Sequence, residues 1–103
     1  MFKIVNMLTI INQIWEISNK SESNSYDAIA RNIRRINSEI EDMGYTVIDP
    51  TNRPYKETDA DIEANIATAL HSNSKVVKVL KPIIYQNENG QNQLAQKGIV
   101  IVE

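Results

Sequence analysis

The sequence has 103 residues, of which 42% are hydrophobic and 23% charged, a composition that fits one ordinary globular domain or two very small ones and excludes a disordered tail. Eleven basic and thirteen acidic residues give a formal charge of -2 without long single-sign blocks, which argues against bulk binding to nucleic acid. The absence of cysteine removes disulfides, thiolate zinc sites and thiol nucleophiles, and a lone His71 leaves little room for imidazole chemistry.

The first predicted element is a helix over residues 2–19, because apolar residues recur there with helical period and cover more than half of the circumference. Asn6, Asn12 and Gln13 interrupt the apolar stretch and no small-residue cleavage pattern follows it, so it does not have the features of a secretory signal peptide. No run reaches the roughly 18 to 20 apolar residues that a membrane span requires. These features predict a cytoplasmic protein with no membrane partner.

A second helix is predicted over residues 25–43, after a polar loop at 18–25. Asn24 or Ser25 is suited to cap its start, and Gly44 lies where a left-handed terminating residue is needed. The apolar positions follow a 4-3-4-3 spacing, which is the a/d seam of a short coiled coil. They are Ile29, Ile33, Ile36, Ile40 and Met43.

These two helices are expected to form an antiparallel hairpin. A hairpin of two helices cannot enclose apolar stripes of this width, so the remaining apolar surface should meet either the rest of the chain or a second copy. A homodimer with a four-helix bundle is the natural solution. The residues predicted to form its interface are Ile11, Ile14, Ile29, Ile33, Ile36 and Ile40.

From Gly44 onward the pattern changes from helical period to short apolar runs separated by turn residues. The runs predicted to be strands are 45–47, 76–80, 83–85 and 99–102. Asn89-Gly90 is the strongest hairpin-turn signal in the chain. Residues 58–71 fit a helix and a strand equally well, so periodicity leaves both open.

The sequence therefore predicts an α+β protein with two domains. Residues 1–43 form the helical hairpin, which is half of a dimeric four-helix bundle, and residues 44–103 form a small all-β domain.

Several clusters of charged residues have an ordinary interpretation beside a functional one. Asp59, Asp61 and Glu63 alternate and would share one face of a strand, where they resemble a cation site or an acid-base pair, but a solvated acidic face is the simpler interpretation. Three arginines on the second helix would offer a contact to phosphate. The simpler interpretation is that they form ion pairs with Glu39 and Glu41 on the same helix. No Gly-rich phosphate loop or nucleophile motif is present, so neither an enzyme, a metal nor a cofactor is expected.

Local strings of this sequence, taken in chain order, resemble the GrpE nucleotide exchange factors of DnaK-type chaperones. Residues 44–50, GYTVIDP, are similar to the family's Gly-Val/Tyr-Glu-Val-Ile-Asp-Pro strand, and residues 76–81, VVKVLK, are similar to Val-Val-Glu-Val-Leu-Gln. Asn89-Gly90, followed by Leu94 and the apolar run 99–102, resembles the family's closing segment. The resemblance is to the head region, without the family's long N-terminal stalk helix.

The resemblance implies a homodimeric co-chaperone, without a cofactor, that binds the ATPase domain of a DnaK-type chaperone through its β domain. The positions it assigns to this contact are Leu80, Asn89, Gly90, Gln91 and Ile101. Gln91 and Ala95 stand where the family has arginine, and a lost charge-assisted hydrogen bond weakens binding by roughly 1.5 to 3 kcal/mol. The alternative is a homodimeric interaction module that has the same fold and no exchange activity.

Overall fold

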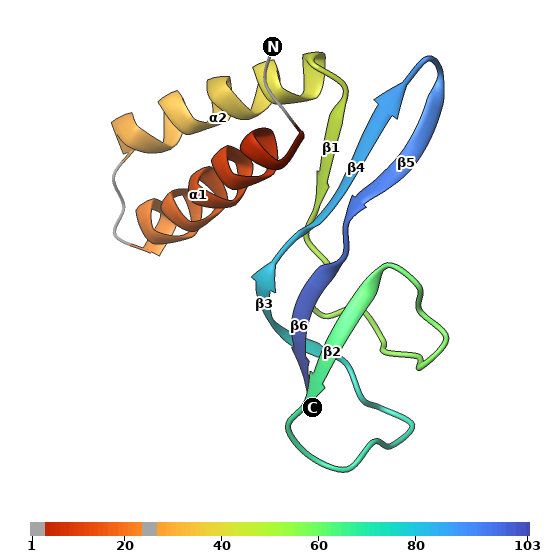
Figure 1. The fold of residues 1–103 in the computed structure, drawn as a ribbon. Coiled ribbons are helices and arrows are strands. Elements are labelled where there is room, and N and C mark those ends of the chain that lie inside the picture. The colour runs from red at the N-terminus through yellow and green to blue at the C-terminus, as the bar shows by residue number, and fades with distance from the viewer. Residues whose placement is uncertain (1–3, 24–26) are drawn as a thin grey trace. The chain divides into compact units, whose positions relative to one another are not determined.

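The computed structural model describes residues 4–23 and 27–103, which form two helices followed by six strands in two sheets (Figure 1). The chain is therefore an α+β protein, as predicted. It divides into two compact units, Met1–Tyr45 and Thr46–Glu103, which we call the helical unit and the β unit. In chain order the elements are α1 (Ile4–Ser23), α2 (Asp27–Asp42), β1 (Tyr45–Ile48), β2 (Ile62–Ile66), β3 (Val76–Lys81), β4 (Ile83–Glu88), β5 (Gln91–Gln96) and β6 (Gly98–Val102).

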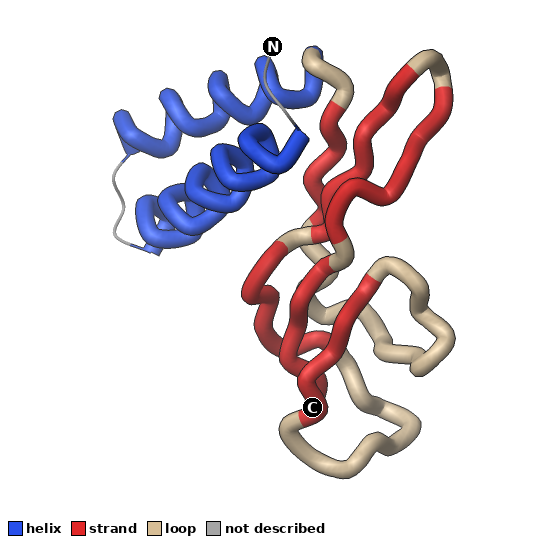
Figure 2. Tube along the Cα trace, in the orientation of Figure 1, coloured by secondary structure: helices blue, strands red, loops and turns tan. Residues whose placement is uncertain are grey.

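The helical unit is a hairpin in which α1 and α2 contact each other along their lengths (Figure 2). Met7 and Ile11 are buried on α1, and Ile33 and Ile40 are buried on α2. Spacings of four and seven residues place each pair on one face of its helix, so these faces form the core of the unit. Within the described residues, neither helix combines the length and apolarity that crossing a membrane requires.

The helix ends differ in how well the sequence predicts them. α1 continues to Ser23, so the prediction of a loop from residue 18 is wrong over residues 18–23. This segment contains no Gly or Pro, and its Lys and Glu are good helix formers, so nothing in it stops the helix. The caps predicted at residues 24 and 25 lie outside the described residues.

The end of α2 matches its prediction. Gly44 has φ 96° and its N–H donates to the carbonyl of Glu41 at 2.9 Å, while the N–H of Met43 donates to the carbonyl of Glu39 at 3.0 Å. A left-handed residue at this position satisfies the last helical carbonyls and turns the chain out of the helix. Glycine is suited to it because it has no Cβ to clash.

In the β unit, one long two-stranded ribbon runs through both sheets (Figure 1). β3 continues into β4 through Pro82, and β5 continues into β6 through Lys97. β3 pairs with β6, and β4 pairs with β5, both antiparallel. The ribbon turns at Asn89 and Gly90, which have φ 54° and 80°, the pair of positive values that a two-residue type I′ turn needs. The predicted hairpin turn is confirmed.

The remaining two strands complete the sheets, with orders β1-β4-β5 and β2-β6-β3. β2 pairs with β6 in parallel, from Ile62 opposite Gly98 to Ile66 opposite Val102. The ambiguous segment 58–71 is therefore a strand in its middle and turn or loop on either side. Pairing with β6 decides for the strand, since it satisfies the backbone groups of β2 and buries Ile62.

The core of the β unit lies between the inner side of the β2-β6-β3 sheet and the start of β4. Its buried residues are Ile62, Val76, Ile83, Val100 and Val102, with Tyr55, Ala64, Val79 and Tyr85 packed against them. Gly98 lies beside this core, where a Cβ would approach Cγ1 of Ile83 to 2.8 Å. The first residue of β6 is therefore a glycine, because Ile83 leaves no space for a Cβ atom.

Candidate protein-binding face

The outer side of the β2-β6-β3 sheet is shaped by two irregularities in β3. Val76 lies opposite Val102 and Lys78 opposite Ile101, so Val77 is an extra residue. The same shift recurs between Val79 and Lys81, which makes Leu80 the second extra residue. Each β-bulge thus sets two residues of β3 against one residue of β6.

The bulges change which side chains of β3 face solvent. Only Val76 is buried, and Val79 packs against the core, whereas the other four residues of the strand are exposed. Val77 and Leu80, on this edge strand of the sheet, are exposed by 37% and 43%. A regular strand would have turned every second residue inward.

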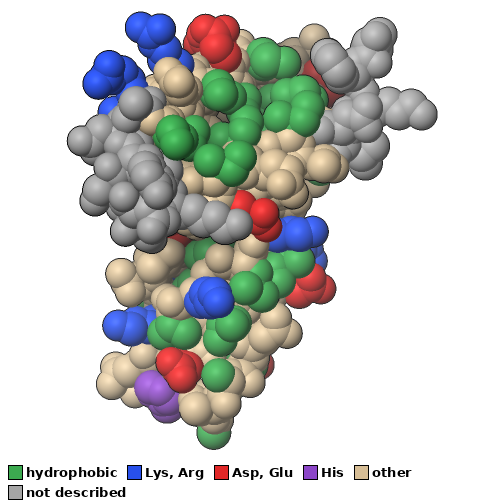
Figure 3. Space-filling model, turned by 90° about the vertical axis from the view of Figure 1, so that its left-hand side faces the viewer, with side chains coloured by type: hydrophobic (Ala, Val, Ile, Leu, Met, Phe, Trp, Pro, Cys, Tyr) green, Lys and Arg blue, Asp and Glu red, His purple; other side chains and the backbone are tan. Residues whose placement is uncertain are grey.

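These side chains form a mixed apolar and basic surface, which we call the outer face. Its members are Val77, Lys78, Leu80, Lys81, Ile99 and Ile101. Ile99 and Ile101 are half-buried in the central strand, opposite Lys81 and Lys78 respectively. Figure 3 views the molecule from the side on which β3 lies in Figure 1, and hydrophobic side chains of the β unit lie there among basic and acidic ones.

The charges of the outer face are arranged in two rows across the sheet. One row runs from Glu63 on β2 through Ile99 to Lys81, and the other runs from Asn65 through Ile101 to Lys78. Across the part of the chain that the structure describes, the ion pairs are those of Arg53, so both lysines keep unpaired ammonium groups. The face is apolar in the middle and basic along β3.

The residues assigned to the chaperone contact divide into two groups. Leu80 and Ile101 lie on neighbouring strands of the outer face, whereas Asn89, Gly90 and Gln91 form the exposed tip of the β4-β5 hairpin. Leu80 and Asn89 are nine residues apart along the ribbon, and at about 3.3 Å each these residues span roughly 30 Å. A partner that uses both must extend along the ribbon.

The six isoleucines predicted for dimerisation differ in their exposure. The three that are buried within this chain are Ile11, Ile33 and Ile40. Ile14 is half-buried, while Ile29 and Ile36 are exposed by 46% and 44%. Only the exposed members have apolar surface left for a second copy.

Sequence reasoning did not single out two exposed positions on α1, Ile10 and Ile17. Directly after α2, Met43 continues the exposed line of Ile29 and Ile36 at seven-residue spacing. The signal was present in the sequence, since a helix that is apolar around more than half of its circumference cannot bury all of it in a two-helix hairpin.

The acidic run after β1 is engaged with an arginine. Nη1 and Nη2 of Arg53 donate to Oδ2 and Oδ1 of Asp61 at 3.1 and 2.6 Å, and Nη2 lies 3.5 Å from Oδ2 of Asp59. The hydrogen bonds from Arg53 hold the pKa of Asp61 below its ordinary value. Two of the three alternating carboxylates thus balance a guanidinium, and the described residues contain no group of three or more side chains suited to a metal ion.

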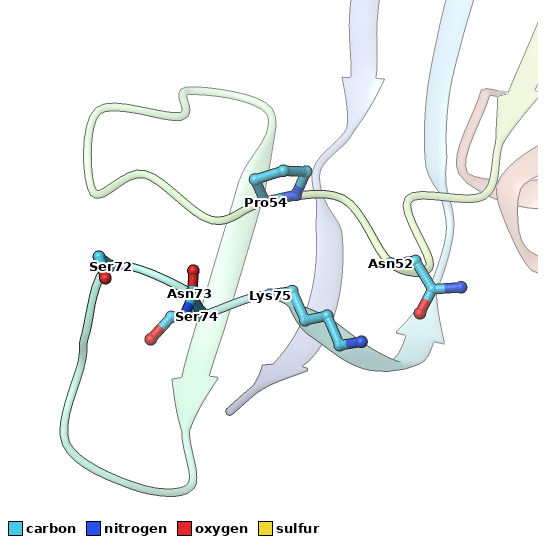
Figure 4. A pocket seen from close by; sticks show the side chains of 6 residues that line it. All are labelled: Asn52, Pro54, Ser72, Asn73, Ser74 and Lys75. Carbon is cyan, nitrogen blue, oxygen red and sulfur yellow. The ribbon is translucent and has the colours of Figure 1, made fainter.

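A shallow hollow of about 190 Å³ lies between two loops of the β unit (Figure 4). It is lined by Asn52, Pro54, Ser72, Asn73, Ser74 and Lys75. Backbone hydrogen bonds join the loops: the N–H of Asn52 donates to the carbonyl of Val76 at 2.8 Å, and that of Tyr55 donates to the carbonyl of Ser74 at 3.0 Å. The segment after β1 thereby pairs with the start of β3 at Val76.

His71 is part of this loop pair. Its ring Nδ1 accepts a hydrogen bond from the N–H of Asn73 at 3.1 Å, and its own N–H donates to the hydroxyl of Ser74 at 2.9 Å. The side chain is exposed. This local turn gives the single histidine a structural use.

Comparison of the chain with models of protein families, with curated protein sequences and with solved structures finds no match. The outer face is the largest group of exposed apolar and basic side chains that the β2-β6-β3 sheet presents.

Proposed function

We propose that this protein is a GrpE-like adenine-nucleotide exchange factor, which binds the ATPase domain of a DnaK-type chaperone through its β unit. One observation carries the proposal. Leu80 and Ile101, which the sequence resemblance assigns to the chaperone contact, lie on neighbouring strands of one solvent-facing apolar surface. Such a surface on a small unit is a feature of protein-protein interfaces.

Exchange of this kind needs no catalytic residue. A factor that binds the open nucleotide cleft of its partner more tightly than the closed cleft lowers nucleotide affinity by the same ratio. A preference of about 4 kcal/mol corresponds to roughly a thousandfold, because each 1.4 kcal/mol is a factor of ten. The continuous β3-to-β6 ribbon offers a stiff element that acts on such a cleft.

The helical unit supports the homodimer in this proposal. Ile29, Ile36 and Met43 leave an exposed apolar line along α2, and Ile10 and Ile17 leave another on α1. A second copy that covers these lines completes a four-helix bundle. We place the protein in the cytoplasm, where its chaperone partner acts.

The test measures release of a fluorescent ADP analogue from the DnaK-type chaperone of the same organism, with and without excess of this protein. We expect the wild-type chain to accelerate release by about tenfold or more, which is about 1.4 kcal/mol of differential binding. Leu80→Asp should abolish the acceleration, because it puts a charge into the centre of the contact.

A matched control is available in the same unit. Leu70 lies in the loop between β2 and β3 and is exposed by 40%, close to the value for Leu80. Leu70→Asp should therefore accelerate release like the wild-type chain. Equal loss of activity in both leucine variants, or no acceleration by the wild-type chain, would contradict the proposal.

One observation favours a second function, a homodimeric interaction module without exchange activity. The hairpin tip has a neutral amide at Gln91, where the resemblance expects a guanidinium, and its side chain is exposed. Binding of the wild-type chain to the chaperone without faster nucleotide release would favour this function. Gln91→Arg then tests whether the missing charge is the cause, since it should restore acceleration.

A further inference from the structure

The outer face also indicates the chemistry of the surface that it binds. Lys78 and Lys81 lie along its β3 side, and the loop acids Asp59 and Asp61 are already paired with Arg53. Residues 75–103 contain four lysines and two glutamates, although the whole chain has a net charge of -2. Of these lysines, Lys78 and Lys81 lie beside the exposed apolar residues, and Glu63 on β2 is the carboxylate of the same two rows.

We infer that the outer face docks on an apolar surface rimmed by two Asp or Glu side chains, one for each lysine. This inference rests on the proposed function, in which that surface belongs to the ATPase domain of the chaperone. The two lysines lie opposite Ile101 and Ile99, which are two residues apart on β6, so at about 3.3 Å each the two carboxylates are spaced by roughly 7 Å.

The bulges of β3 are what produce this combination. Opposite Ile101 they place Val77 together with Lys78, and the next bulge repeats the arrangement with Leu80 and Lys81 opposite Ile99. Each row therefore offers two apolar side chains for burial and one ammonium group that stays at the rim. The lysine methylenes add apolar contact area, while the ammonium groups remain in water until the partner arrives.

Charge also distinguishes between possible occupants of the face. Two lysines stand against a single carboxylate, Glu63, so two copies facing each other would bring an excess of positive charge together. An acidic partner surface has no such penalty. Rim charges of this kind speed association and select the partner, because oppositely charged patches steer encounter.

The experiment measures binding of the full chain to the chaperone at low and high salt. For the wild-type chain we expect association to slow by about tenfold or more as salt rises, since surface charges are screened. One exposed ion pair contributes at most about fivefold in affinity. Lys78→Glu with Lys81→Glu replaces two attractions with repulsions and should weaken binding by more than tenfold.

Two further variants isolate the effect of charge. Lys78→Met with Lys81→Met keeps the apolar stems and should bind with little salt dependence. Lys56→Glu makes the same charge change on the loop between β1 and β2 and should bind like the wild-type chain.

The outcomes separate the two proposals. Unchanged binding of the double Glu variant, with binding lost in Leu80→Asp, overturns this inference and leaves the exchange function standing. Absence of wild-type binding at every salt concentration overturns both. A lower mass of the double Glu variant in light scattering, with the wild-type mass at two copies, assigns the face to a second copy and overturns the acidic partner.

Discussion

Gly98→Ala is expected to destabilise the β unit for a reason of space. An added Cβ would lie 2.8 Å from Cγ1 of Ile83, whereas carbon atoms in ordinary contact are about 3.5 to 4.0 Å apart. Ile83 is fully buried and has no room to withdraw. Overpacking of this kind costs about 1 to 3 kcal/mol.

A second effect opposes this cost. Replacing glycine with alanine restricts the unfolded chain and stabilises a protein by about 0.4 to 1 kcal/mol where the native conformation permits it. The net expectation is a loss of about 1 to 2 kcal/mol in the free energy of unfolding. Urea unfolding of the full chain, followed through NMR amide signals of β6, measures it.

Gly90 provides the contrast that identifies the cause. A Cβ there would meet nothing within 4 Å, but φ is 80°, a value that L-residues rarely adopt. Gly90→Ala should cost about 1 to 2 kcal/mol through backbone strain, and Gly90→Asn less, because asparagine tolerates this conformation. Gly98→Asn should be worse than Gly98→Ala. If Gly98→Ala is as stable as the wild-type chain, the argument from close packing fails.

Two further predictions follow from the ion pair and from the helical unit. The pKa of Asp61 is lowered by Arg53, so the pair stabilises the fold above the unfolded pKa of about 4 and this contribution disappears as pH falls through the lower folded value. Asp61→Asn should lower the free energy of unfolding at neutral pH by about 1 kcal/mol or less. Between pH 6 and 2, this free energy should fall less steeply in the variant than in the wild-type chain. Ile33→Asp should unfold the helical hairpin, because Ile33 is buried within the chain, whereas Ile36→Asp should keep the helical circular dichroism and halve the mass in light scattering. An unchanged mass for Ile36→Asp would show that a second copy does not cover this line.

Features with a local signal could be predicted from the sequence. Gly44 ends α2, and Asn89-Gly90 closes the hairpin with two positive φ values, because few residue types adopt these conformations. Pro82 separates two strands since it has no N–H to donate. The chaperone contact that the family resemblance assigns to Leu80 and Ile101 stays a prediction.

Features that depend on pairing between distant segments could not be predicted. β5 is built from amide-rich residues with weak strand preference, and its pairing with β4 makes it a strand. β2 depends in the same way on its parallel pairing with β6. The bulges of β3 are set by its register with β6, although the repeated apolar-apolar-Lys pattern of VVKVLK already departs from strict alternation.

The central position of β6 determines when the β unit forms during synthesis. β2 and β3 lie on either side of β6 and do not pair with each other, so neither edge has its partner until residues 98–102 have been made. At 5 to 20 residues per second, the 36 residues from the end of β2 to the end of β6 take roughly 2 to 7 seconds. During that time two strands with free edges are open to wrong pairing.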